Sequence, residues 1–183
     1  MLKAISEHGV LNKCITNSLT ENDCGVLINQ GLDGKYIALD IDNYYHSLGL
    51  EKCPPTADRL LIIRCLVCDD GCSVYVYEMK NVKRSQGFSV KNIYDKFTTT
   101  IDDFMKVKFQ DVFLNPDYRV KTFRVLFISD AYRLLCRGYT KDEIRSFLSG
   151  TKIDILQSLP PFKYKNKVAM IEYELPNPVI CQD

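Results

Sequence analysis

The sequence predicts a small α/β domain in which a mixed β-sheet is flanked by helices. Three observations support this class: two apolar, β-branched runs joined by a turn signal, a helical stripe directly after them, and a capping box ahead of a last strand. A chain of 183 residues is long enough for one domain with its own core. We expect a single domain over residues 1–183, with its core at about 35–130 and a C-terminal helix and edge strand at 140–175.

The first fifty residues predict two short helices and one strand. Apolar side chains recur at loosely helical spacing at the N-terminus, and Thr20 resembles the N-cap of a second helix with Glu21 and Asp23 in its first turn. The run KYIALDID, residues 35–42, then predicts the first strand. Two consecutive prolines break the chain before the next element.

The best-supported element is a central hairpin. The run DRLLIIRCLVC, residues 58–68, is too short and too rich in Ile, Leu and Val to need a helix, and SVYVYEMK, residues 73–80, contains strong β-formers. Asp69, Asp70 and Gly71 between them are a turn signal. We therefore expect two antiparallel neighbouring strands.

The rest of the chain predicts alternating helices and strands. Ser89 is a plausible N-cap for a helix to about Met105, because apolar residues recur there at steps of three and four. The later elements are a strand at 122–129, a helix from the Thr140–Glu143 capping box to Gly150, and an edge strand at 167–175. Crossovers through helices give parallel neighbours, so the sheet should be mixed.

Composition restricts the environment more than the function. The net charge is +1, no apolar run approaches the ~20 residues that span a bilayer, and the N-terminus lacks the apolar region of a secretory signal. We expect a cytoplasmic protein without a membrane partner. Cys65, Cys68 and Cys72, with Cys53 upstream, could hold zinc or an iron–sulfur cluster, but most of the eight cysteines are expected to be small buried hydrophobes.

Three charged residues of the hairpin could carry chemistry. Side chains alternate along a strand, so Glu78 and Lys80 should project to one face. Asp58 opens the partner strand and shares that face in half of the possible registers. A turn centred on Asp70 would place Asp58 beyond Lys80, so contact with Glu78 requires a wider loop centred near Cys68, or a bulge.

Two adjacent carboxylates form an oxygen-rich site for Mg²⁺ or Mn²⁺. Such a cation activates water and stabilises charge on a phosphate, and a nearby lysine can orient that water or bind the pentacovalent phosphorane. Asp58, Glu78 and Lys80 are therefore our candidate catalytic residues, with Asp58 and Glu78 as the metal ligands. Asp40 and Asp42 form a second, weaker D-x-D candidate on the first strand.

The sequence CPPTAD, followed by an apolar strand, a turn and VYVYEMK, resembles the PD-(D/E)xK nuclease superfamily, which includes restriction endonucleases and junction resolvases. The resemblance implies a restriction-endonuclease-like αβββαβ core, with Asp58 as the first acid, Glu78 as the second and Lys80 as the lysine. Pro55 lies three residues before Asp58, whereas the family often has it adjacent. The family often adds an acid from an early helix, for which Glu21 or Glu7 could serve.

The resemblance implies a Mg²⁺-dependent DNA endonuclease of the restriction type, for which a homodimer is the simplest way to cut both strands. Lys83, Arg84 and Lys91 follow the hairpin with no acidic residue among them, and we expect them to bind DNA phosphates. The alternative is a catalytically inactive accessory protein that keeps the fold and acts through nucleic-acid or protein contacts.

Overall fold

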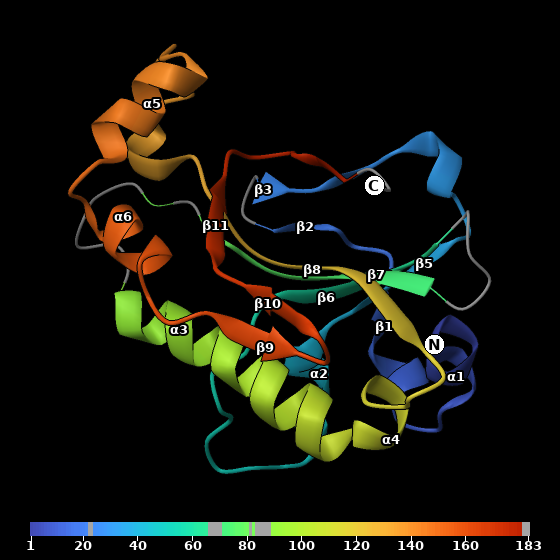
Figure 1. The fold of residues 1–183 in the computed structure, drawn as a ribbon. Helices are drawn as coiled ribbons and strands as arrows, with labels where there is room; N and C mark the ends of the chain where they lie inside the picture. The colour runs from blue at the N-terminus through green and yellow to red at the C-terminus, as the bar shows by residue number, and fades with distance from the viewer. Residues whose placement is uncertain (22–23, 66–70, 81, 83–88, 181–183) are drawn as a thin grey trace.

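A six-stranded mixed sheet forms the centre of the molecule (Figure 1). The structure is a computed structural model, and it describes residues 1–21, 24–65, 71–80, 82 and 89–180. In spatial order the strands are β1 (Ile15–Thr16), β5 (Tyr36–Leu39), β6 (Arg59–Arg64), β7 (Gly71–Met79), β8 (Arg119–Ile128) and β11 (Ile171–Glu174). β1, β5, β6 and β7 pair antiparallel, whereas β8 is parallel to β7 and β11 is parallel to β8. The predicted mixed sheet is confirmed, with β11 at its edge.

The helices largely follow the local signals in the sequence. α3 (Val90–Thr98) begins at the predicted N-cap Ser89, whose side chain accepts from the Asn92 N–H, and the chain continues as the π-helical η4 (Thr99–Lys108). The Thr140–Glu143 capping box opens α5 (Lys141–Leu148) as predicted. The remaining helices are α1 (Leu2–Glu7), η1 (Leu11–Cys14), η2 (Gln30–Leu32), α2 (Ile41–Ser47), α4 (Gln110–Phe113), η5 (Ala131–Arg133) and α6 (Lys152–Gln157). Over the described ranges, none of the helices has the length and apolar character needed to cross a membrane.

The sheet separates two apolar layers. Even-numbered residues of the hairpin, such as Leu60, Ile62 and Val76, face the larger layer, which contains Ile93 and Phe97 of α3. Odd-numbered residues such as Leu61 and Tyr75 face the smaller layer. Figure 1 shows α3 running along one side of the sheet, with β2 and β3 on the other. The even-numbered face of the hairpin is thus the helix-covered face.

Short strand pairs cover the second face, and here one prediction is wrong. Thr20 does not begin a helix. It belongs to β2 (Thr20–Glu21), which pairs antiparallel with β3 (Cys24–Gly25), so that Thr20 lies opposite Gly25. The capping signal at Thr20 is local, and strand pairing overrides it. β4 (Leu27–Ile28) pairs with β12 (Val179–Ile180) on this second face, with Ile180 in the smaller layer. The hairpin of β9 (Phe162–Tyr164) and β10 (Lys167–Ala169) lies instead on the helix side, where Phe162 and Tyr164 join the larger layer.

The first predicted strand ends earlier than expected. β5 stops at Leu39, and Asp40 becomes the N-cap of α2, where its side chain accepts from the Asn43 N–H. Asp42 lies in the first turn of that helix. The expectation that Asp40 and Asp42 share a strand face is therefore wrong, since an aspartate at this position can cap a helix as readily as it can end a strand.

Candidate functional site: a buried carboxylate pair with a lysine

The register of the β6–β7 hairpin brings Asp58 next to Glu78. Arg59 lies opposite Tyr77, and Arg64 lies opposite Cys72, so the pairs are symmetric about position 68. This is the wide-loop register that the sequence required for contact, although residues 66–70 themselves lie outside the described part. Asp58 precedes Arg59 and Glu78 follows Tyr77, so both carboxylates reach the helix-covered face at the same end of the hairpin.

Asp58 is held by the backbone of the partner strand. Its Oδ2 accepts a hydrogen bond from the Met79 N–H at 2.6 Å, and the residue is 7% exposed. The preceding residue is fixed as well, because the Ala57 N–H donates to Thr100 Oγ1 at 2.9 Å. Burial raises the pKa of Asp58, although the Lys96 ammonium and the Met79 N–H act in the opposite direction.

Glu78 is the most perturbed acid of the site. It is 2% exposed, and burial followed by the Asp58 charge raises its pKa to about 8. The interaction between the two carboxyl groups raises the pKa of Glu78 and lowers that of Asp58. Glu78 Oε2 accepts no hydrogen bond from the N–H and O–H groups of the described residues. At neutral pH the pair therefore carries less than two full negative charges.

Lys96, on α3, completes the cluster. Its Nζ donates to Glu78 Oε1 at 2.7 Å and lies 3.6 Å from Asp58 Oδ1. Burial lowers the pKa of Lys96, but Glu78 and Asp58 outweigh burial and raise it overall, so the ammonium is charged. The Lys96 side chain is 22% exposed and is the most accessible of the three.

Lys80, the predicted catalytic lysine, is not the lysine that contacts the two acids. β7 ends at Met79, and the Lys80 N–H donates to Ile128 O on β8. Among the described residues no ion pair joins Lys80 to Asp58 or Glu78, and its catalytic role stays a prediction. The lysine that reaches both carboxylates comes from the following helix.

Further charged groups surround the cluster. Glu21, in β2, has a pKa raised by burial and by the charge of Asp58, so this early acid lies within electrostatic range of the site. The other early candidate, Glu7, is paired with Lys3 at 3.8 Å on α1. Arg59 lies 3.4 Å from Asp40 and donates to the carbonyl oxygen of Asp58, which helps to fix the strand end.

Lys96 and Thr100 are site residues that sequence reasoning missed, whereas Asp42 was considered only as part of the separate D-x-D candidate. Lys96 and Thr100 are four residues apart, on the same helical face as the predicted apolar stripe. Two polar residues interrupting that stripe are a signal that could have found them. Asp42 accepts from Thr56 Oγ1 and is close enough to raise the pKa of Lys96.

Two of the three predicted DNA-binding cations lie outside the described residues. Lys83 and Arg84 fall in the segment that is not described. Lys91 is exposed on the first turn of α3 and pairs with Asp95. Its binding role stays a prediction.

The carboxylate pair offers oxygen donors of the kind that a divalent cation takes, with two acids in direct contact with Lys96 among the described residues. The described residues contain no cluster of three or more His, Cys, Asp or Glu side chains suited to a metal. However, Glu78 Oε2 is a buried oxygen without a donor, and an oxygen pair is what hard cations prefer. The predicted cysteine site is not assembled from described residues: Cys53 and Cys72 have free thiols, and Cys68 is not described.

Comparison of the chain with protein-family models, with curated proteins and with solved structures found no match. The site must therefore be interpreted from its own geometry.

Proposed function

We propose that the protein is a divalent-cation-dependent phosphodiester hydrolase of the PD-(D/E)xK type, acting on DNA as an endonuclease. The observation that carries this proposal is the convergence of Asp58, Glu78 and Lys96 at one end of the β6–β7 hairpin. Two carboxylates and a lysine are the set expected for phosphodiester hydrolysis.

The arrangement of elements supports the same proposal. α1 precedes three antiparallel strands, β5, β6 and β7, and α3 then leads to β8, which is parallel to β7. This order is compatible with the αβββαβ core that the resemblance implies, with α2 as an addition between β5 and β6 and with η1, β1–β4 and η2 as additions between α1 and β5. The two acids occupy the start of the second core strand and the end of the third.

Each residue has a definable task in the proposed reaction. Asp58 and Glu78 would hold Mg²⁺, which supplies an activated water and neutralises charge on the phosphate. The Met79 N–H keeps the Asp58 carboxylate oriented, because it occupies one of the two carboxylate oxygens. Lys96 would orient the attacking water or bind the charge that builds on the phosphorane, as the exposed end of its side chain allows.

Glu78 must lose its proton before it can hold a cation. Its raised pKa makes the proton a competitor for the same oxygens at neutral pH. Lys96 would then exchange part of its bond to Glu78 for a bond to substrate. Nuclease activity should accordingly rise with pH towards about 8.

The proposal is tested by cleavage of a supercoiled plasmid with Mg²⁺ or Mn²⁺. We expect nicking by the wild type, and a loss of at least about a hundredfold in Asp58→Asn, Glu78→Gln and Lys96→Met. Asp102→Asn and Lys108→Met are matched controls, because both side chains are exposed on η4. Equal activity in all six proteins, or none in any, would contradict the proposal.

A second candidate is a non-catalytic accessory protein, and one observation favours it. Glu78 is almost completely buried, and Lys96 already neutralises the pair, which is also how a purely structural polar cluster is built. Calorimetric titration with Mn²⁺ separates the two. A hydrolase should bind Mn²⁺ in a manner that Glu78→Gln abolishes, whereas a structural cluster should give no binding heat in either protein.

A further inference from the structure

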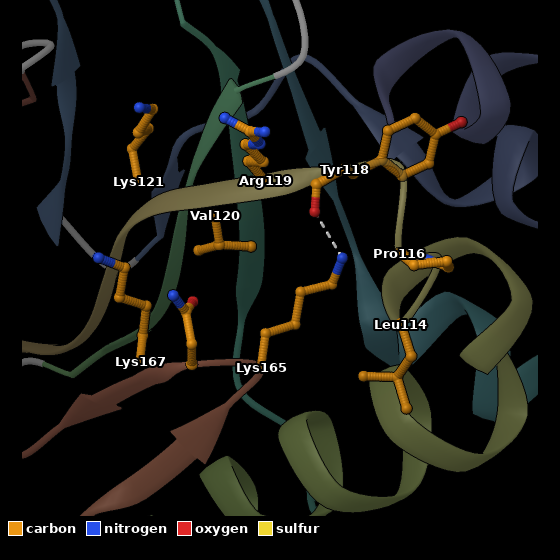
Figure 2. A pocket seen from close by; sticks show the side chains of 9 residues that line it. Leu114, Pro116, Tyr118, Arg119, Val120, Lys121, Lys165 and Lys167 are labelled. Atoms are coloured by element: carbon orange, nitrogen blue, oxygen red, sulfur yellow. Dashed lines mark hydrogen bonds between the residues drawn. The ribbon is translucent and has the colours of Figure 1, made fainter.

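A basic cavity lies at the opposite end of the sheet from the carboxylate pair. It is an open hollow with a volume of about 560 Å³, bordered by the start of β8 and the turn of the β9–β10 hairpin (Figure 2). Its cationic lining residues are Arg119, Lys121, Lys165 and Lys167, and none of its lining residues is acidic. Such an unbalanced lining favours an anionic ligand.

A β-bulge presents two of these cations. Val120 lies opposite Cys72 and Thr122 lies opposite Ser73, so Lys121 is an extra residue in β8. Val120 is buried, whereas Arg119 and Lys121 are exposed on either side of it, and Figure 2 shows both side chains rising from the same side of β8. Bulges redirect side chains in this way at binding sites.

Hydrogen bonds fix the β9–β10 side of the cavity to the chain that leads into β8. Lys165 Nζ donates to Asn115 O and, at 2.6 Å, to Tyr118 O, which ties the hairpin turn to the loop before β8. Tyr164 strengthens this link, because its hydroxyl donates to Phe113 O at 2.7 Å and its ring packs on Phe123. A cavity with fixed walls needs little ordering when a ligand binds.

The positive surface continues beyond this cavity. A neighbouring cavity of about 310 Å³ shares Tyr118 with the first and is lined by Lys3 and Arg64, with Asp117 as its acidic member. The cations are therefore spread over two adjoining hollows. A single small phosphate would meet only some of them, whereas a chain of phosphates could contact both sets.

We propose that these two adjoining cavities bind the backbone phosphates of a nucleic-acid strand. Gly71, which pairs with Arg119, is seven residues from Glu78 along β7, so this surface lies about 23 Å from the carboxylate pair. The inference goes beyond the proposed hydrolase and does not require it. It assigns Lys121 and Lys167 to phosphate contacts, with Lys165 holding the wall.

The test is fluorescence anisotropy with a labelled 20-nucleotide single strand and a labelled 20-base-pair duplex, in EDTA so that no cleavage can occur. We expect wild-type binding that weakens with salt, and a loss of at least about tenfold in a Lys121→Gln/Lys167→Gln double variant, together with a salt slope reduced by about two. Lys141→Gln, a single-charge control on the exposed first turn of α5, should bind as the wild type does.

Two results would overturn the inference. One is that the wild type and the double variant bind each oligonucleotide with the same affinity, or that neither protein binds either oligonucleotide. The other is binding of pyrophosphate, measured by calorimetry, by a protein that binds neither oligonucleotide, since the cavity would then serve a small phosphorylated molecule. Because EDTA removes divalent cations, failure of plasmid cleavage leaves this result unaffected.

Discussion

Lys96 of α3 donates to Glu78 of β7 across the interface between helix and sheet, with 2.7 Å between Nζ and Oε1. This bond connects α3 to the hairpin, and the sequence signals do not predict how these two parts pack together. It also joins a charged ammonium to an acid whose pKa is raised to about 8. Stability, pH response and any cation affinity of the site are therefore linked.

Replacement of Lys96 by Met should destabilise the protein. The change leaves two buried acids without their cation, and we expect the free energy of unfolding to fall by about 1–3 kcal/mol at pH 7. This loss is smaller than is usual for a broken buried ion pair, because Glu78 can keep its proton. The loss should increase at pH 9. Urea denaturation measures both values, with Lys108→Met as the exposed control, expected within about 0.5 kcal/mol of wild type. A Lys96→Met protein as stable as that control would show that the bond contributes nothing.

Replacement of Glu78 by Gln should change how stability depends on pH. The folded-state pKa of Glu78 is about 8, above its ordinary value of 4.5, so between these values the folded protein holds a proton that the unfolded chain has lost. Wild-type stability should therefore fall as pH rises through this window. Glutamine resembles the protonated acid, so Glu78→Gln should be the more stable protein at pH 9, by more than about 1.4 kcal/mol, the equivalent of one pKa unit. Parallel pH profiles of the two proteins would contradict the assignment.

Mn²⁺ affinity should rise with pH in the proposed hydrolase. Binding displaces the proton of Glu78, so the dissociation constant should fall about tenfold per pH unit below pH 8 and level off above it. Calorimetry between pH 6 and 9 provides the measurement, and the buffer dependence of the heat counts the released protons. A dissociation constant that does not change with pH would mean that Glu78 is not a ligand.

Thr100 should matter for the position of Asp58. Thr100→Val removes the acceptor of the buried Ala57 N–H, which should cost about 1–3 kcal/mol because that donor is left without a partner. Thr100→Ser keeps the hydroxyl and should recover most of the loss. Thermal unfolding compares the two variants, and equal melting temperatures would indicate that the hydroxyl is not the cause.

Local signals predicted much of the fold. The Ser89 and Thr140 caps and the β6–β7 hairpin depend on residues close in sequence, and the structure confirms them. The signal at Thr20 failed because pairing with Gly25 is stronger than an isolated cap. The end of β5 failed because Asp40 is compatible with both a strand end and a helix start.

The candidate site was predictable in part, because only some of its contacts depend on residues close in sequence. The shared face of Asp58 and Glu78 follows from strand alternation and hairpin register, which are short-range properties. The approach of Lys96 depends on how α3 packs on β7, which no spacing rule encodes. Lys80 was the natural choice from its position two residues after Glu78, but the ion pairs of the two acids among the described residues are with Lys96.

The symmetric pairing of β6 and β7 also shows what keeps the two acids together. A slip of one residue between the strands would turn Leu60 and Ile62 out of the larger layer. The same slip would carry Asp58 to the opposite face of the hairpin from Glu78. Residues of the apolar core, which touch no substrate, therefore decide whether the two carboxylates meet at all.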